Sequence, residues 1–184
     1  MNGINRIEYK FKIQLLSKMT FAVNIVCFTQ ANNEFILKEL AFVPVDIDKD
    51  PIVLLFKPPF EWKKLKRKFR KQNLCLKHHY HGIAWNSGSF DYNTIKCILH
   101  EHLNDSTKII VNSEIKKKWF ERFNLRCSIV NINDYEYSKL NRPKVVTICT
   151  NHNGAYKISC ALHSIKIMKK FYSQNIEEFD WEDV

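Results

Sequence analysis

The order of the apolar segments constrains the fold of this chain most strongly. Residues 21–28 form an apolar run with several β-branched side chains, residues 30–33 are rich in turn-forming side chains, and residues 35–43 are apolar again. This pattern predicts a β-hairpin. A third short strand is expected at residues 52–56, after an acidic loop and before the prolines at positions 58 and 59. Three consecutive antiparallel strands therefore open the predicted sheet.

Helical and strand patterns alternate in the rest of the chain. Asn73 is expected to interrupt the first helical pattern, and Asp91 stands where it can cap the second. The expected helices cover residues 61–79, 92–103, 114–123, 134–140 and 159–172, and the expected strands cover residues 108–111 and 128–132. Three strands followed by this alternation predict an α/β fold, a mixed sheet with helices on both faces.

The length of 184 residues, with only four glycines and five prolines, predicts one domain without flexible linkers. We assign residues 19–172 to this domain, residues 1–18 to an N-terminal extension and residues 173–184 to an acidic C-terminal tail. The six cysteines stand mostly singly in apolar segments, which indicates a reducing compartment. No apolar run is long enough to span a bilayer, and residues 11–16 are too short for a signal peptide. We therefore expect an intracellular protein, cytoplasmic or nuclear.

Three side chains near the end of the chain are good zinc ligands. Cys149 and His152 are separated by two residues, and Cys160 follows. Thiolate and imidazole suit this cation, but a structural site needs a fourth ligand. Locally His163 is available, and otherwise the ligand must come from a distant segment. The alternative is that both cysteines are small buried apolar residues and that His152 is a loop residue.

The formal net charge of +10 favours a polyanionic partner, nucleic acid above all. An A/T-rich coding bias is the alternative source of so many lysines. Cationic side chains gather along the first expected helix, where Trp62 and Phe69 could anchor them. A solvated helix face is the alternative interpretation of such a run. The candidate nucleic-acid-binding residues are Lys63, Lys64, Lys66, Arg67, Lys68, Arg70 and Lys71.

Residues 19–172 resemble the ribonuclease H-like fold, in its DnaQ-type 3′-5′ exonuclease branch. The segment His81-Gly82-Ile83, ahead of a helix, is similar to a His-Gly-Ile segment of those exonucleases. The strand at residues 108–112, followed by the helix with Trp119 and Phe120, resembles the unit that carries their second active-site carboxylate.

The resemblance implies two divalent metal ions held by four carboxylates, which this chain lacks. The first strand reads Asn24-Ile25-Val26 where the family has an Asp and a Glu two residues apart. The second acidic position falls within Lys116-Lys117-Lys118, and residues 160–172 contain no Asp or Glu. Neutral and cationic side chains do not replace carboxylate ligands of hard cations. We therefore expect no catalytic residues at this place.

A degenerate exonuclease domain with a zinc site resembles the Maelstrom domain of the piRNA and transposon-silencing pathway. In that family a Glu of the second strand joins Cys and His ligands around the start of the last helix. The resemblance implies that Glu39 completes a structural zinc site with Cys149, His152 and Cys160. The alternative for Glu39 is an exposed strand residue paired with a lysine. This chain has no HMG box ahead of the domain, so any piRNA role is implied by resemblance alone.

We expect a non-catalytic, zinc-stabilised domain that binds nucleic acid, with single-stranded or structured RNA as the favoured partner. One alternative is an RNA nuclease with a relocated or metal-independent site. A second is a protein-interaction scaffold. His78, His79 and His81 are interpreted as loop residues, with His81 positioning the backbone before Gly82, because no carboxylate or serine stands near them in the sequence.

Overall fold

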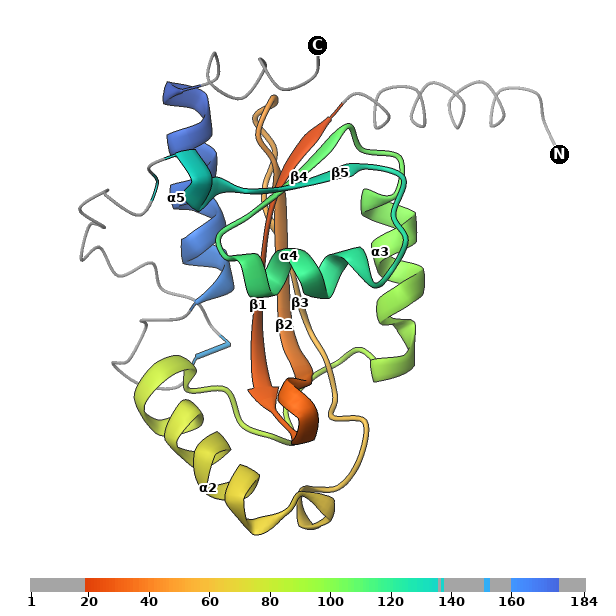
Figure 1. The fold of residues 1–184 in the computed structure, drawn as a ribbon, viewed down its shortest axis with the longest axis vertical. Coiled ribbons are helices and arrows are strands. Elements are labelled where there is room, and N and C mark those ends of the chain that lie inside the picture. Colours follow the sequence, from red (N-terminus) through yellow and green to blue (C-terminus); the bar gives the residue numbers. More distant parts are fainter. Residues whose placement is uncertain (1–18, 136, 138–150, 153–159, 176–184) are drawn as a thin grey trace, which may run out of the picture.

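The computed structural model describes residues 19–135, 137, 151–152 and 160–175. In this part of the chain, five strands form one sheet in the order β3-β2-β1-β4-β5 (Figure 1). Neighbouring strands are antiparallel from β3 to β1 and parallel from β1 to β5. The strands are β1 (Thr20–Thr29), β2 (Phe35–Pro44), β3 (Ile52–Leu55), β4 (Lys108–Val111) and β5 (Ser128–Asn131). The predicted mixed sheet is confirmed, with each strand within two residues of its expected bounds.

The β1–β2 hairpin is the longest pairing in the sheet. Its two strands have ten residues each, and a short 3-10 turn at Ala31–Asn33 joins them. Within this turn Asn32 has a left-handed backbone conformation with a φ of 60°, which asparagine tolerates better than most residues. Apolar side chains fill both faces of the hairpin, so the central strands are buried on both sides.

Helices cover both faces of the sheet (Figure 1). On one face, α3 (Ile95–Leu103) and α4 (Glu114–Glu121) pack with Phe21, Val23 and Leu40 in one apolar cluster. On the other face, α5 (Ala161–Gln174) packs with Ala22, Ala41 and Val43 in a second cluster. Because successive side chains of a strand point to opposite faces, odd-numbered residues of β2 beyond Leu37 point toward α5. This alternation sets where the functional side chains of β2 lie.

The expected single helix at residues 61–79 is wrong. The chain forms a 3-10 turn at Trp62–Lys64, an extended break at Lys66, helix α2 at Arg67–Leu76 and a π-helical turn, η3, at Lys77–His81. The apolar residues of this region do not form one helix stripe. Instead they gather around Phe28 and Trp85 at the end of the hairpin. Asn73 does not interrupt α2 but lies buried within it.

The other differences are local. Helix α3 is preceded by a 3-10 turn at Tyr92–Thr94. Asp91 is the N-cap residue of this turn and makes no side-chain capping bond, while its carboxylate pairs with Lys57 at 2.9 Å. Of the helix expected at 134–140, the structure describes a 3-10 turn at Ile132–Tyr135. Residues 1–18 and 176–184 lie outside the described part. Within that part, no helix has the length and apolar character needed to cross a membrane.

Candidate metal centre and candidate nucleic-acid interface

Glu39, His152 and Cys160 converge on one point between strand β2 and the start of helix α5. All three residues are buried, and one potential ligand atom from each lies within 4.8 Å of the other two. Within the group, His152 Nε2 lies 3.2 Å from Glu39 Oε2. We call these residues the three-donor cluster. The alternative in which Glu39 is an exposed strand residue is wrong, because its exposed fraction is 0%.

The Glu39 carboxylate is also held by neighbouring donors. The backbone N–H of Ala161, the first residue of α5, donates to Oε2 at 3.1 Å, and the Asn151 amide donates to Oε1 at 3.1 Å. Burial alone would raise the pKa of Glu39, but the bonds and charge of His152, together with these two donors, lower it below its ordinary value. The cluster therefore keeps an anionic oxygen inside the protein.

The orientation of the His152 ring is fixed from its other side. Its Nδ1 contacts the carbonyl oxygen of His81, and because a carbonyl only accepts, Nδ1 carries a proton and donates it. Nε2 therefore faces Glu39. Burial alone would lower the pKa of His152, but bonds to Cys160 and Glu39, the Glu39 charge and the His81 carbonyl raise it to about 10. In the metal-free protein the ring is thus an imidazolium paired with the Glu39 carboxylate.

The donor set and its spacing fit a zinc ion. Four ligands placed about 2.0–2.1 Å from a tetrahedral ion lie about 3.3 Å from one another. The separation of 3.2 Å between His152 Nε2 and Glu39 Oε2 matches this edge. Metal-bound histidines commonly donate the second ring N–H to a backbone carbonyl, as His152 does to His81. An ion at this point would replace the Nε2 proton.

Two further ligand candidates remain. Cys149, the remaining predicted ligand, lies outside the described residues. His163, the local competitor, does not contribute a ring nitrogen to the cluster. Its backbone N–H instead donates to Cys160 Sγ at 3.4 Å, which caps the start of α5. The described geometry therefore disfavours His163 as the fourth ligand.

Lys38, which the sequence analysis did not single out, is a second buried charge beside the cluster. Its ammonium donates to the carbonyls of Phe56, Trp85 and Ser87 at 2.6, 2.8 and 2.7 Å. Burial lowers the pKa of Lys38 to about 8. Adjacent residues of β2 thus hold different segments, since Lys38 fixes the loop at 85–87 and Glu39 contacts α5. The signal that the sequence offers for Lys38 is that two charged residues stand together in the middle of an apolar strand.

The place where the resemblance implies metal-binding carboxylates holds an ammonium group. Lys116, in the first turn of α4, donates to Asn24 Oδ1 in the middle of β1. It also donates to Asn112 Oδ1 at 2.8 Å, just after β4. Lys116 is therefore turned toward the sheet and does not extend an exposed cationic surface with its neighbours in the sequence.

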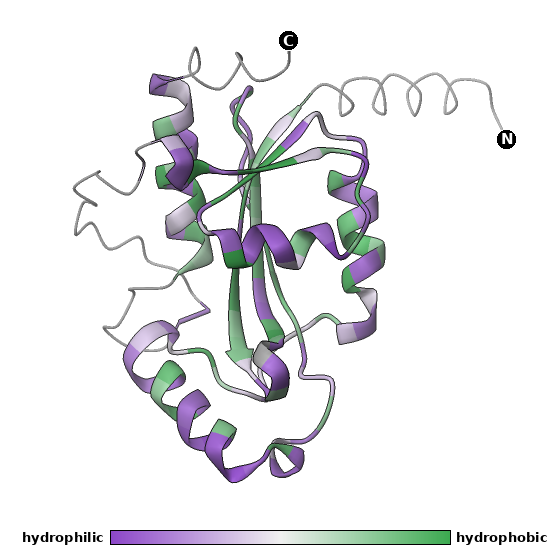
Figure 2. Cartoon of the chain, in the orientation of Figure 1, coloured by the Kyte–Doolittle hydropathy of each residue, from purple (hydrophilic) through white to green (hydrophobic). Residues whose placement is uncertain are grey.

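Positive charge is concentrated in residues 62–81, which we call the basic arm. The arm contains eight of the 29 Lys and Arg residues and none of the 19 Asp and Glu residues, so the rest of the chain is almost neutral, with 21 against 19. All the candidate nucleic-acid-binding side chains are exposed except Arg70, which is half-buried. Figure 2 shows α2 as mostly hydrophilic, with isolated apolar bands. Exposed Leu74 and Tyr80 lie on the same arm.

The arm packs on the rest of the protein through apolar side chains, chiefly Trp62 and Leu65, and polar contacts fix helix α2 and the end of the arm. Within α2 only Asn73 is buried. Its side-chain amide bonds Thr29, at the end of β1. Asn73 Oδ1 accepts from the Thr29 backbone N–H at 2.9 Å and from the Thr29 hydroxyl at 3.1 Å, and Asn73 Nδ2 donates to the Thr29 carbonyl oxygen at 2.9 Å. At the far end, the His81 ring accepts from the Ile83 N–H at 3.0 Å, and burial and the nearby His152 lower its pKa to about 4. His81 therefore positions the backbone before Gly82 as a neutral ring.

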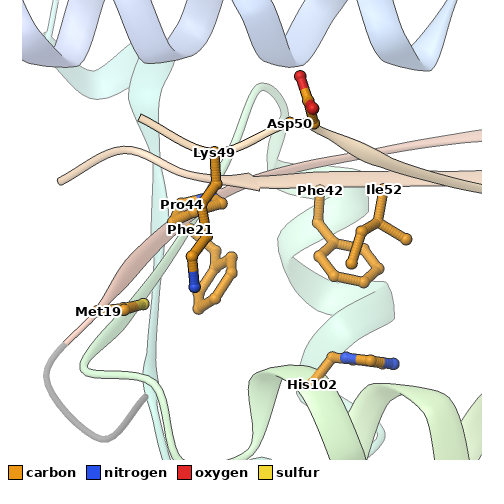
Figure 3. Close-up of a pocket in the computed structure, with 8 residues that line it drawn as sticks. All are labelled: Met19, Phe21, Phe42, Pro44, Lys49, Asp50, Ile52 and His102. Atoms are coloured by element: carbon orange, nitrogen blue, oxygen red, sulfur yellow. The ribbon is translucent and has the colours of Figure 1, made fainter. Parts of the chain in front are cut away.

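A small pocket of about 100 Å³ lies elsewhere, on the α3 side of the sheet (Figure 3). Apolar side chains including Phe21, Phe42 and Ile52 line it, and His102 approaches from α3. Phe42 points to the face opposite Glu39, because the two positions differ by an odd number of residues along β2. This pocket is therefore separate from the three-donor cluster.

No family model and no curated protein sequence matches this chain. Among solved structures, Escherichia coli exonuclease I in complex with a dT13 oligonucleotide matches with a TM-score of 0.54 and 10% identity, covering 89% of this chain and 43% of that chain. The same enzyme with a 5cy-dA13 oligonucleotide matches with a TM-score of 0.55 and 12% identity, covering 89% of this chain and 42% of that chain. Exonuclease I from Methylocaldum szegediense matches with a TM-score of 0.53 and 10% identity, covering 89% of this chain and 42% of that chain. The chain thus spans less than half of these exonucleases and shares their ribonuclease H-like fold.

Proposed function

We propose that this protein is a non-catalytic nucleic-acid-binding domain, stabilised by a structural zinc ion, with single-stranded or structured RNA as its partner. The observation that carries the proposal is the basic arm, an exposed segment with eight Lys and Arg residues and no acidic residue. Such a segment gains affinity for phosphates through the release of counterions. The related fold of exonuclease I, solved with oligonucleotides, supports a single-stranded partner.

The three-donor cluster and Cys149 would hold the zinc ion. With four protein ligands, no position is left for a water molecule, so the ion would stabilise structure and not catalyse hydrolysis. It would join three parts of the chain that are far apart in the sequence: strand β2 at Glu39, the segment at His152 and the start of α5 at Cys160. Oxygen, nitrogen and sulfur donors together favour zinc over magnesium.

The absence of catalysis is supported by Lys116. Its ammonium bonds two neutral amide oxygens, those of Asn24 and Asn112, where the resemblance implies two divalent cations. A fixed positive charge repels such cations. A role in transposon silencing, with piRNA, is part of the proposal only through the resemblance to the Maelstrom domain. An intracellular location is part of it through the pattern of single cysteines.

The test is a filter-binding titration of labelled single-stranded RNA at several salt concentrations. One variant changes Arg67, Lys68 and Lys71 to glutamine, and a matched control changes the exposed Lys96, Lys166 and Lys170. For single strands the slope of log K against log salt changes by roughly 0.7 per phosphate contact, so we expect the arm variant to lose about two units of slope. The control should keep the wild-type slope.

Equal losses in both variants would refute the arm as the interface and favour a compositional charge. RNA cleavage by the pure wild-type protein, lost on changing Glu39 or His152, would instead support the nuclease alternative. Capture of a protein partner that resists nuclease treatment, with no RNA binding, would support the scaffold alternative.

A further inference from the structure

The three-donor cluster and the basic arm meet at one hydrogen bond. His152 belongs to the cluster, and its Nδ1–H donates to the carbonyl oxygen of His81. His81 is the last residue of η3, the turn that ends the basic arm. The bond is buried and joins residues 71 positions apart. The ring that would bind the ion with one nitrogen therefore holds the end of the arm with the other.

We propose that the His152 ring couples the two sites, so that zinc binding at the cluster holds the basic arm in its nucleic-acid-binding position. This inference rests on the proposed function. Zinc binds through Nε2 only when the ring is in place, and in that position Nδ1 bonds the arm. Zinc therefore stabilises the docked arm by mass action.

The remaining attachments of the arm explain why this bond matters. Among the described residues of α2, only Asn73 is buried, and it bonds the end of β1. That contact fixes the middle of the arm, whereas the His81 carbonyl fixes its end. Beyond His81, the chain turns at Gly82, whose φ of 70° is left-handed, and Lys38 then holds the carbonyls of Trp85 and Ser87. An arm that loses the bond at the His81 carbonyl still packs through Leu65 and the His81 ring, so the part that loosens is the turn at residues 77–83.

Hydrogen exchange of the wild-type protein tests the coupling directly. The amides of Gly82 and Ile83 donate within the turn, to Lys77 O at 2.9 Å and to His81 Nδ1 at 3.0 Å. If the turn opens only after His152 leaves, their exchange should slow by the factor by which zinc stabilises the cluster, about 100-fold at a zinc concentration 100 times its Kd. The amide of Ala161, which donates to Glu39, reports the occupancy of the cluster itself. Slower exchange at Ala161 with unchanged exchange at Gly82 and Ile83 would overturn the proposal.

A pair of variants separates the coupling from metal binding. His152→Cys keeps a zinc ligand but has no second donor for the His81 carbonyl. In this variant we expect hydrogen exchange at Gly82 and Ile83 to be the same with and without zinc. We expect its affinity for a single-stranded oligouridylate, measured with zinc bound, to fall about three- to ten-fold, as for one lost hydrogen bond. Cys160→Asp changes a different ligand of the cluster. The new side chain keeps an acceptor that can cap α5, and the bond from His152 to the His81 carbonyl stays intact. Zinc-dependent protection of Gly82 in His152→Cys would contradict the coupling.

Reciprocity supplies an independent measurement. If zinc raises the affinity for the oligouridylate by some factor, the oligouridylate must raise the affinity for zinc by the same factor. Competition with a chelating dye measures the second quantity. An oligouridylate that binds without changing the zinc affinity would refute the coupling and leave the proposed function standing. A protein that shows zinc-dependent protection of Gly82 but binds no nucleic acid would refute the proposed function and leave the coupling standing.

Discussion

Replacing Asn73 with alanine removes the side chain that joins helix α2 to the end of strand β1. The side chain is fully buried and makes bonds of 2.9, 3.1 and 2.9 Å to Thr29. Each net hydrogen bond contributes about 1 kcal/mol, and a buried group left without a partner costs about 1–3 kcal/mol. Thr29 is only half-buried, so water can reach part of the vacated site. We expect the free energy of unfolding to fall by about 2–4 kcal/mol.

Urea unfolding followed by tryptophan fluorescence measures this loss. With a slope of about 2 kcal/mol per molar urea, the midpoint should fall by roughly 1–2 M. The matched control is Gln72→Ala, an exposed neighbour in the same helix, for which we expect a change within about 0.5 kcal/mol. A loss below about 0.5 kcal/mol for Asn73→Ala would refute the account of how the arm is attached, as would equal losses in the two variants.

Three further outcomes are expected. Because burial lowers the pKa of Lys38 to about 8, this group binds fewer protons in the folded protein than in the unfolded chain above that pH, so its own contribution to stability rises with pH, whereas His152, whose pKa is raised to about 10, contributes in the opposite direction. The free energy of unfolding of the wild type minus that of Lys38→Met should therefore rise by about 1 kcal/mol between pH 7 and pH 9, and a difference that does not change with pH would contradict this. Ser113 accepts from the Lys116 N–H at 3.3 Å at the start of α4, so Ser113→Ala should cost about 1 kcal/mol in urea unfolding while Ser113→Asp should not. Mg²⁺ or Mn²⁺ should not induce cleavage of labelled RNA or DNA, since the Lys116 ammonium lies between Asn24 and Asn112; metal-dependent cleavage by the pure protein would show that this interpretation is wrong.

The strands and the helices on both faces could be predicted because they follow from local apolar patterns. The long runs around Val23 and Leu40 are buried on both sides, and such runs are typical of central strands. The helix expected at 61–79 failed because periodicity does not show what an aromatic side chain packs against. Trp62 and Leu65 have helical spacing, but they pack against Phe28 and Trp85 from a short turn and an extended segment.

The site depended on information that spacing cannot supply. Glu39 and His152 are 113 residues apart, so only the resemblance to a known domain placed them together. Local alternation does show that Glu39 shares a face with Ala41 and Val43, and a carboxylate among such residues must find a partner. The adjacent Lys38 follows the same logic, since its buried ammonium takes three backbone carbonyls. A charged residue in the middle of an apolar strand therefore indicates a partner elsewhere in the fold.

Metal analysis of the purified protein tests the central claim most directly. The account predicts about one zinc per chain. It also predicts that zinc is lost in Glu39→Gln, which keeps the size of the side chain but removes its charge, and in Cys149→Ser and Cys160→Ser, while His163→Ala retains it. A folded chain that binds no zinc when zinc is supplied, or that keeps its zinc after Glu39→Gln and Cys160→Ser, would contradict the account.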